Sequence, residues 1–362
     1  IALPIMMRVG YSHRLATGVI AASGTITQVI PPSLVLIVLA DQLGRSVGDM
    51  YLGAIGPSIA QVLIFLLFIF VASRVSPRSM PPLPESDRTL RGMALLVRVV
   101  RGILPSLALI FVVLGTIFMG LATPTEAGAM GVVGALGLAA LHRRLNWTMV
   151  REGMESTMGI TVMVIFILMG ATVFTLVFQG VDGGVWVEHL FTRVGADDPV
   201  TFLIVVNILI FLLAFFLDFF EIAFIVIPLL APMADKLGID LIWFGVLICV
   251  NMQTSFMHPP FGFALFYLRG IAPKSIPSKD IYLGAIPWLG LQLLLVGILI
   301  FFPQIVTGFL DKPQAVDLQS IEIRLDDSEA AVGDGSVSPA DTKEKGASSA
   351  PSDDPADYFK RR

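Results

Sequence analysis

The chain has 362 residues, of which 55% are hydrophobic and only 14% are charged, and its formal net charge at pH 7 is -4. A mean hydropathy of +0.83 is far above that of soluble globular domains, so the sequence indicates a polytopic membrane protein in a lipid bilayer. The mild charge gives no reason to expect a nucleic-acid partner. The single cysteine, Cys249, excludes a disulfide framework and a thiolate metal site, and we expect it to be a small buried hydrophobe.

Residues 1–73 are predicted to form the remaining part of the first of two repeats. A short hairpin arm leads into a helix from residue 13 to about 39 that is interrupted in its middle, and residues 52–73 are long and apolar enough to span a membrane. The chain begins without an initiator Met or a charged leader. We therefore expect a preceding part of the natural protein to carry the other hairpin arm and its tip.

Residues 74–158 are predicted to form a basic loop and two connecting spans, at 92–119 and 125–141. The second span follows the segment "ATPTEAG", in which Thr123 precedes Glu126 by three positions and Pro124 stands at the first helical position. This spacing is typical of a capping box, so we expect Glu126 to have a structural role.

Residues 159–310 are predicted to form the second repeat, with a span at 159–178, a hairpin, an interrupted helix and a final span at 282–302. The hairpin arms, 202–217 and 222–236, are each too short to cross a bilayer comfortably, which favours a re-entrant hairpin. The interrupted helix runs from residue 241 to about 269.

Three pairs of matching motifs, in the same order along the chain, define the two repeats. If the basic residues of the short loops are cytoplasmic, the two halves have opposite orientations, so we predict an inverted-topology repeat within an all-α membrane fold. The pairs are "PIMMRVG" at 4–10 with "PMADKLG" at 232–238, the Pro-Pro pairs at 31–32 and 259–260, and "DMYLGAI" at 49–55 with "DIYLGAI" at 280–286 after a three-residue insertion.

Residues 311–362 differ in composition from the rest of the chain. They are rich in Asp, Glu, Ser, Pro, Gly and Ala and cannot bury a core. We expect a disordered acidic tail, and the loop-charge pattern places it outside the cytoplasm.

The break in the first interrupted helix carries the segment Ser23, Gly24 and Thr25. Lipid cannot satisfy freed backbone groups, which cost several kcal/mol each, so such breaks persist only beside a cavity or a ligand. Gly24 is expected to allow backbone angles that free carbonyl groups, and the two hydroxyls add oxygen atoms of the kind that hard cations bind. The segment therefore predicts a small-cation site.

The same polar stretch continues through Thr27 and Gln28 until Pro31 and Pro32 end the hydrogen bonding of the helix. We expect these four residues to lie near the substrate. The alternative for the whole stretch is that its small and polar residues serve helix packing, as they commonly do inside membranes.

The second break repeats this chemistry with Asn251, Gln253, Thr254 and Ser255. Neutral oxygens suit a monovalent ion better than a divalent one, so two related clusters predict two Na+ sites. His258, Pro259 and Pro260 follow, and we expect them near the substrate. His258 either titrates or touches the substrate, or it satisfies a freed carbonyl group as a packing residue.

Asp218 and Glu221, at the predicted hairpin tip, are the most costly polar residues in the apolar part of the sequence. Three roles are open for them: a cation ligand, a proton carrier, or a cap for the second hairpin arm. We expect Asp218 among the Na+ ligands and Glu221 near the substrate. If the tip reaches the headgroups, both are simply solvated.

Other chemical signatures are missing from the sequence. It contains no phosphate-binding loop for ATP, no His/Cys metal spacing and no nucleophile elbow. We therefore expect no enzyme activity, no organic cofactor and no transition metal, and we expect an ion gradient to supply the driving force.

Four segments resemble the large membrane (M) subunit of tripartite ATP-independent periplasmic (TRAP) transporters. The resemblance extends from residue 1 to about 309, and the Ser-Gly-Thr to Pro-Pro-Ser stretch and the Thr-Pro-Thr-Glu-Ala stretch are its specific parts. The segments are "GYSHRLATGVIAASGTITQVIPPS" at 10–33, "VGDMYLGAI" at 47–55, "ATPTEAGA" at 122–129 and "LGIDLIWFGVLICVNMQTSFMHPPFG" at 237–262.

The resemblance implies an elevator-type Na+ symporter of the bacterial inner membrane that imports organic acids such as C4-dicarboxylates or sialic acids. It also implies a periplasmic substrate-binding protein and a small four-helix membrane subunit as partners. The first Na+ site would use Ser23, Gly24 and Thr25. The second would use the tip from Asp218 to Glu221 with Asn251, Gln253, Thr254 and Ser255. The sequence departs from the common family pattern at "DFFE" and at His258.

Three alternatives remain. A stand-alone dicarboxylate or anion transporter of the same superfamily would need no binding protein. An ion channel fits two interrupted helices in inverted repeats less well, although channels contain re-entrant hairpins. A membrane-embedded enzyme is disfavoured, because the sequence shows no paired catalytic residues.

Overall fold

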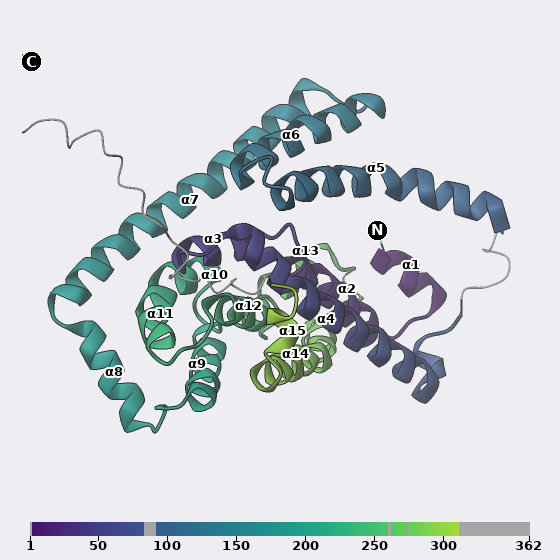
Figure 1. Ribbon diagram of the computed structural model, residues 1–362. Coiled ribbons are helices and arrows are strands. Elements are labelled where there is room, and N and C mark those ends of the chain that lie inside the picture. The colour runs from purple at the N-terminus through teal and green to yellow at the C-terminus, as the bar shows by residue number, and fades with distance from the viewer. Residues whose placement is uncertain (1, 83–91, 260–261, 274, 311–362) are drawn as a thin grey trace, which may run out of the picture. The chain divides into compact units, whose positions relative to one another are not determined.

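The computed structural model of the protein describes residues 2–82, 92–259, 262–273 and 275–310, and every regular element in these ranges is helical (Figure 1). The predicted tail at 311–362 and Pro260 lie outside the described residues. The first half contains α1 (Ala2–Val9), α2 (His13–Thr25), η1 (Ile26–Gln28), α3 (Leu34–Gln42), α4 (Val47–Val75), η2 (Pro77–Ser79), α5 (Gly92–Phe118) and α6 (Pro124–Leu141). The second half contains α7 (Trp147–Gly180), α8 (Gly183–Arg193), α9 (Pro199–Leu213), α10 (Phe219–Glu221), η4 (Ile222–Val226), α11 (Ile227–Lys236), α12 (Leu241–Met252), η5 (Gln253–Phe256), α13 (Phe263–Ile271), α14 (Ser278–Phe301) and α15 (Gln304–Thr307).

Five helices in the described ranges are long and apolar enough to cross a membrane: α4, α5, α6, α7 and α14. They coincide with the five spans predicted from sequence, which confirms an all-α protein with several apolar spans. The largest difference is at α7, which starts well before residue 159. Asn146 caps this helix early, because its side-chain Oδ1 accepts a hydrogen bond from the Met149 backbone N–H at 2.7 Å.

Both interrupted helices are present. The first consists of α2, the short 3₁₀ segment η1 and α3, and the second consists of α12, the 3₁₀ segment η5 and α13. In each half the broken helix is followed by a long apolar span, α4 or α14. The predicted order of elements thus occurs twice, while the opposite orientation of the two halves remains a prediction.

The segment from α9 to α11 forms the two arms and the tip predicted for a hairpin. Asp198 starts α9, since its Oδ2 accepts hydrogen bonds from the N–H groups of Val200 and Thr201. After the tip, Ile222–Val226 is a π-helix, in which the Ile227 N–H bonds to the Ile222 carbonyl five residues earlier. Whether the hairpin is re-entrant stays a prediction.

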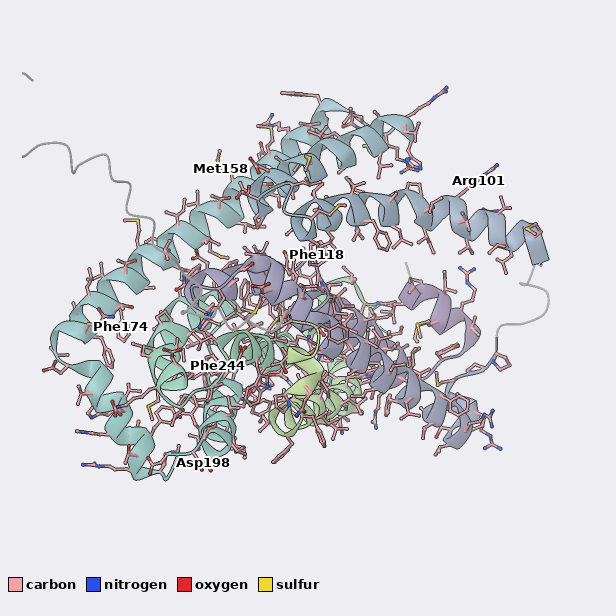
Figure 2. All side chains as sticks on the ribbon, in the orientation of Figure 1. Arg101, Phe118, Met158, Phe174, Asp198 and Phe244 are labelled. Carbon is pink, nitrogen blue, oxygen red and sulfur yellow. The ribbon has the colours of Figure 1, made fainter. Side chains whose placement is uncertain are left out.

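The most deeply buried helix is α12, in which every residue from Phe244 to Met252 is buried. It packs against α3, α4, α9 and α14, so it is surrounded by elements of both halves. In Figure 2, Phe244 lies among the side chains of these packed helices, whereas Arg101 on α5 and Met158 on α7 project away from their ribbons. The short helix α12 is thus surrounded by protein rather than by lipid.

The helices α5, α6 and α7 bury almost none of their apolar side chains within the described part of the chain. α5 packs against α6, where Leu109 lies over Gly134. α7 contacts α8, α10 and η4. Their apolar exteriors are what a lipid environment requires.

An ion pair joins α8 to α11. The Lys236 ammonium donates a hydrogen bond to the Glu188 carboxylate, and the pair fixes the end of the second hairpin arm against the helix that follows α7. The hydrogen bond and the positive charge of Lys236 hold the pKa of Glu188 below its ordinary value. Because both side chains are largely exposed, we expect this contact to orient the helices more than to stabilise them.

Helices α2 and α14 approach each other closely, and glycine makes the approach possible. A Cβ atom at Gly18 would lie 2.1 Å from the Gly284 carbonyl oxygen, and one at Gly284 would lie 2.2 Å from the Arg14 carbonyl oxygen. Backbone atoms cannot move aside as a side chain can. Small residues at this contact therefore allow the first broken helix and the last span to pack directly.

Gly284→Ala should destabilise the protein by about 1–3 kcal/mol, because the added methyl group would push α14 away from α2. Gly290→Ala on the same helix is the matched control, since nothing lies within 4 Å of its Cβ position. The measurement is the free energy of unfolding in mixed detergent micelles. Equal stability of the two variants would contradict the packing argument.

Candidate functional site

The first helix break begins later than the sequence suggested. Ser23, Gly24 and Thr25 form the last turn of α2, and Gly24 is not among the residues with a positive φ, so its expected role in freeing carbonyl groups is wrong. The α-helical pattern ends at Ile26, after which the Val29 N–H bonds to the Ile26 carbonyl at 3.2 Å. Pro31 and Pro32 have no N–H to extend the helix, which is the physical reason for the break.

Hydroxyl groups of the first break donate their hydrogens to carbonyls one turn earlier. Ser23 Oγ bonds to the Ile20 carbonyl at 3.1 Å, Thr25 Oγ1 to Ala22 at 3.0 Å and Thr27 Oγ1 to Gly24 at 2.8 Å. The hydrogen atoms point back along the helix, so the oxygen lone pairs face the other way. Such oxygens are suited to accept a hydrogen bond or a cation.

Gln28 and Ser33 organise the turn between η1 and α3. The Gln28 backbone carbonyl accepts hydrogen bonds from the Ser33 hydroxyl and from the Cys249 thiol on α12. Ser33 also caps α3 by accepting from the Leu36 N–H at 3.3 Å. The Gln28 side-chain Oε1 is buried and has no hydrogen-bond partner among the described residues. Cys249 is fully buried, as predicted.

The second break repeats the hydroxyl pattern. Thr254 Oγ1 donates to the Asn251 carbonyl and Ser255 Oγ donates to the Met252 carbonyl, each at 2.7 Å. Asn251, Gln253 and Thr254 are almost completely buried. Both breaks thus combine a 3₁₀ turn with hydroxyl oxygens whose hydrogens are already used.

Asn251 is tied to the hairpin arm by a residue that the sequence analysis missed. Its Nδ2 donates to the backbone carbonyl of Asn207 on α9 at 2.8 Å and to the Asn207 side-chain Oδ1 at 3.0 Å. The Asn251 Oδ1 is buried without a partner in the described ranges. Both residues line a groove of about 310 Å³ between α9 and α14 that is otherwise apolar. An isolated Asn in an apolar arm was the available signal for Asn207.

The hairpin tip forms a capping box. Asp218 Oδ1 accepts from the N–H groups of Phe220 and Glu221, and the Glu221 carboxylate accepts from the Asp218 N–H at 3.2 Å. Of the three roles left open by the sequence, the structure therefore shows the cap for the second arm. In the part of the chain that is described, these hydrogen bonds stay within the tip and do not reach Asn251, Gln253, Thr254 or Ser255.

His258 is inserted between two aromatic rings, Phe211 on α9 and Phe215 just after it. Its ring stacks on Phe215 at a centroid distance of 4.1 Å and meets the edge of Phe211 at 4.5 Å. Only 1% of the residue is exposed, and neither ring nitrogen has a side-chain or carbonyl partner that meets hydrogen-bond geometry in the described residues. Contact with the substrate and satisfaction of a freed carbonyl group therefore both stay predictions for His258. Pro259, next to it, is half-buried.

A network of buried amide side chains connects the two breaks, and this network was also not predicted from the sequence. Gln292 on α14 reaches Thr25 in the first break and Gln253 in the second, and Gln61 on α4 pairs with Gln253. Gln61 and Gln292 occupy corresponding positions of the repeat, since Tyr51 and Tyr282 begin the same "YLGAI" motif. A repeat alignment extended into the two spans would have revealed this pair.

The capping box at Glu126 is confirmed. The Thr123 N–H donates to Glu126 Oε2 at 2.8 Å, and the Glu126 N–H donates to Thr123 Oγ1 at 3.3 Å. Glu126 thus starts α6, and the predicted structural role is the one that its contacts support.

Comparison with known proteins identifies the family. Residues 1–305 match the profile of the family described as "Tripartite ATP-independent periplasmic transporter, DctM component". The chain belongs to the DctM family. Members of this family are the permease subunits of transporters, and permeases are not a class of enzymes. As a DctM protein, the chain is a multi-pass protein of the inner membrane, in agreement with its apolar helices.

Individual DctM relatives have different names. The chain is 30% identical to the C4-dicarboxylate TRAP transporter large permease protein DctM of Pseudomonas aeruginosa and 29% identical to that of Vibrio cholerae, covering 84% and 83% of this chain and 69% of each relative. It is 27% identical to the sialic acid TRAP transporter large permease protein SiaM of Vibrio cholerae, covering 81% of this chain and 67% of the relative. Further relatives are named for isethionate and ectoine.

The Asn207–Asn251 pair should contribute to stability as a unit. Replacing either residue by Leu leaves the other without its buried partner and should cost about 1–3 kcal/mol. The double variant should lose less than the sum of the two, by about 0.5 kcal/mol or more. The measurement is a double-mutant cycle of unfolding free energies in micelles. Additive losses would show that the two amides do not interact.

Proposed function

We propose that this DctM chain is the permease subunit of a Na+-coupled symporter that imports organic acids. The observation that carries the proposal is the pair of helix breaks. Each has hydroxyl oxygens whose hydrogens are bound to carbonyls of the preceding turn, which leaves their lone pairs for a cation. A buried amide oxygen without a partner in the described residues adds a further acceptor near each break, Gln28 Oε1 in the first and Asn251 Oδ1 in the second.

The first Na+ site is assigned to Ser23, Gly24 and Thr25 and the second to Asn251, Gln253, Thr254 and Ser255. In the second site, the capping geometry of Asp218 and Glu221 supports an indirect role, in which the tip shapes the site without its carboxylates binding the ion. Neutral oxygens at both places favour Na+ over a divalent cation. The two sites would lie at the meeting point of two inverted repeats, as interrupted helices do in secondary transporters.

The proposed substrates are organic acids, because relatives are named for C4-dicarboxylates and for sialic acid. We expect a periplasmic binding protein to deliver the acid and a small four-helix membrane subunit to assemble with this chain. We propose an elevator movement, in which the tightly packed helices around α12 carry the site. The separate packing of α5 with α6 supports assigning these helices to the static part.

Uptake should depend on Na+ in liposomes that contain the full-length protein with its small subunit and its binding protein. Ser23→Ala and Thr254→Val each remove one proposed ligand oxygen and should raise the Na+ concentration for half-maximal uptake by about 10-fold. Thr17→Val is the matched control, since in the described part of the chain its buried hydroxyl bonds only to backbone carbonyls of α2. Unchanged uptake after replacing Na+ by K+ would refute Na+ coupling.

His258→Phe should separate substrate contact from packing. Phenylalanine keeps an aromatic ring between Phe211 and Phe215 but removes both ring nitrogens. If a ring nitrogen binds the acid, the KM for the acid should rise about 10-fold or more, with an unchanged melting temperature. A variant with wild-type KM and stability would assign His258 to packing alone.

A further inference from the structure

The Gln292 side chain links the two helix breaks, beside a second contact in which the Thr25 hydroxyl meets Met257 Sδ at 3.5 Å. Gln292 Nε2, on the last long span α14, donates to Thr25 Oγ1 at 3.2 Å and to Gln253 Oε1 at 3.2 Å. Thr25 is the last residue of α2 and Gln253 is the first residue of η5. The Gln292 amide group therefore bridges the interruption of the first half and that of the second half.

This link is sealed from solvent. Thr25 is 2% exposed, and Gln253 and Gln292 are completely buried. A hydrogen bond in such surroundings is electrostatically stronger than in water, and a partner that moves leaves an unsatisfied polar group behind. Small displacements of Thr25 or Gln253 are therefore passed on through Gln292.

Gln61 is a chemically matched amide that does not make the same connection. It exchanges two hydrogen bonds with Gln253, Nε2 to Oε1 at 2.6 Å and the reverse at 3.1 Å. It is 1% exposed and lies on α4, at the repeat position that corresponds to Gln292 on α14. None of the hydrogen bonds found for it in the described residues goes to the first break. Gln61 thus anchors one break, whereas Gln292 joins both.

We propose that Gln292 is a positioning residue that makes Na+ binding at the two breaks cooperative. The inference rests on the proposed Na+ function. A cation bound at Thr25 Oγ1 fixes a hydroxyl that also accepts from Gln292, which fixes the amide and, through it, Gln253 Oε1. The first ion thereby orders the second site, and the second ion binds to a site that is already arranged.

The competing explanation is that the buried amides only hold the helices together, as polar side chains commonly do in membrane interiors. That explanation predicts the same effect for substitutions of Gln61 and Gln292, because both are buried amides bonded to Gln253. Cooperative Na+ binding predicts different effects for the two substitutions, because of these two amides only Gln292 has a hydrogen bond to the first break in the described residues. The two variants Gln292→Met and Gln61→Met therefore discriminate, and methionine keeps the volume while removing the hydrogen bonds.

The experiment is equilibrium binding of radioactive Na+ to the purified full-length protein with its small membrane subunit, at constant ionic strength. For the wild type we expect two ions bound with a Hill coefficient near 2. Gln292→Met should bind two ions with a Hill coefficient close to 1, and Gln61→Met should keep the wild-type value. Melting temperatures of the two variants serve as the stability control, and they should fall by similar amounts.

The outcomes separate the inference from the function on which it rests. An absence of Na+ binding to the wild type would overturn the Na+ function itself. Two ions with a Hill coefficient of 1 in the wild type would overturn only the coupling. Equal Hill coefficients in Gln292→Met and Gln61→Met would assign both amides to packing and overturn the special role of Gln292. If Gln292→Met fails to fold, Gln292→Asn, which keeps a buried amide but shortens the side chain so that it no longer reaches both Thr25 and Gln253, should give the same loss of cooperativity.

Discussion

The structure depends on one constraint: a backbone N–H or carbonyl group placed in an apolar environment must find a partner. Two helices are interrupted inside the packed protein, and each break has a short 3₁₀ turn and hydroxyls bonded back to carbonyls of the preceding α-helix. Because α12 lies at the centre of the core, the second break is enclosed by protein and not by lipid. The polar side chains at the breaks follow from this need as much as from any ligand.

Close packing around the breaks is achieved by small residues on one side and amides on the other. The glycines of α2 and α14 bring the first broken helix and the last span to backbone contact. Such an approach places the Gln292 side chain deep between the breaks. Packing and polar chemistry are therefore two consequences of the same helix geometry, and a change at Gly18 or Gly284 would disturb both.

The sequence predicted the helical elements well because their signals are local. Paired prolines, an apolar stretch of membrane length and a Thr-Pro-Thr-Glu capping pattern each act within a few residues. The apolar spans and the Glu126 capping box were found where expected, and the first break begins only slightly later. The start of α9 was misplaced by a few residues, although the Asp198 cap followed by Pro199 was a usable signal. Gly24 was predicted to interrupt the helix because glycine can adopt non-helical backbone angles. It need not adopt them, and here the helix continues through Gly24.

The polar contacts of the candidate site could not be predicted in the same way. The partners of Asn251 and Gln253 are Asn207, Gln61 and Gln292, which are far away in sequence and reach the breaks only after the helices have packed. A lone amide in an apolar span shows that a partner is needed, not which one. The repeat provides part of the missing information, because Gln61 and Gln292 occur at the same position after "YLGAI".

The π-helical stretch Ile222–Val226 at the start of the second hairpin arm has a consequence for how the tip is aimed. A π-turn holds one residue more than the α-turn it replaces, and each residue of an α-helix turns the chain by about 100°. The number of residues between the tip and α11 therefore sets the direction in which Asp218 and Glu221 face relative to α11. The chemistry of these two side chains does not set it. A chain shortened by one residue there would keep every polar group of the tip and present it to a different neighbour.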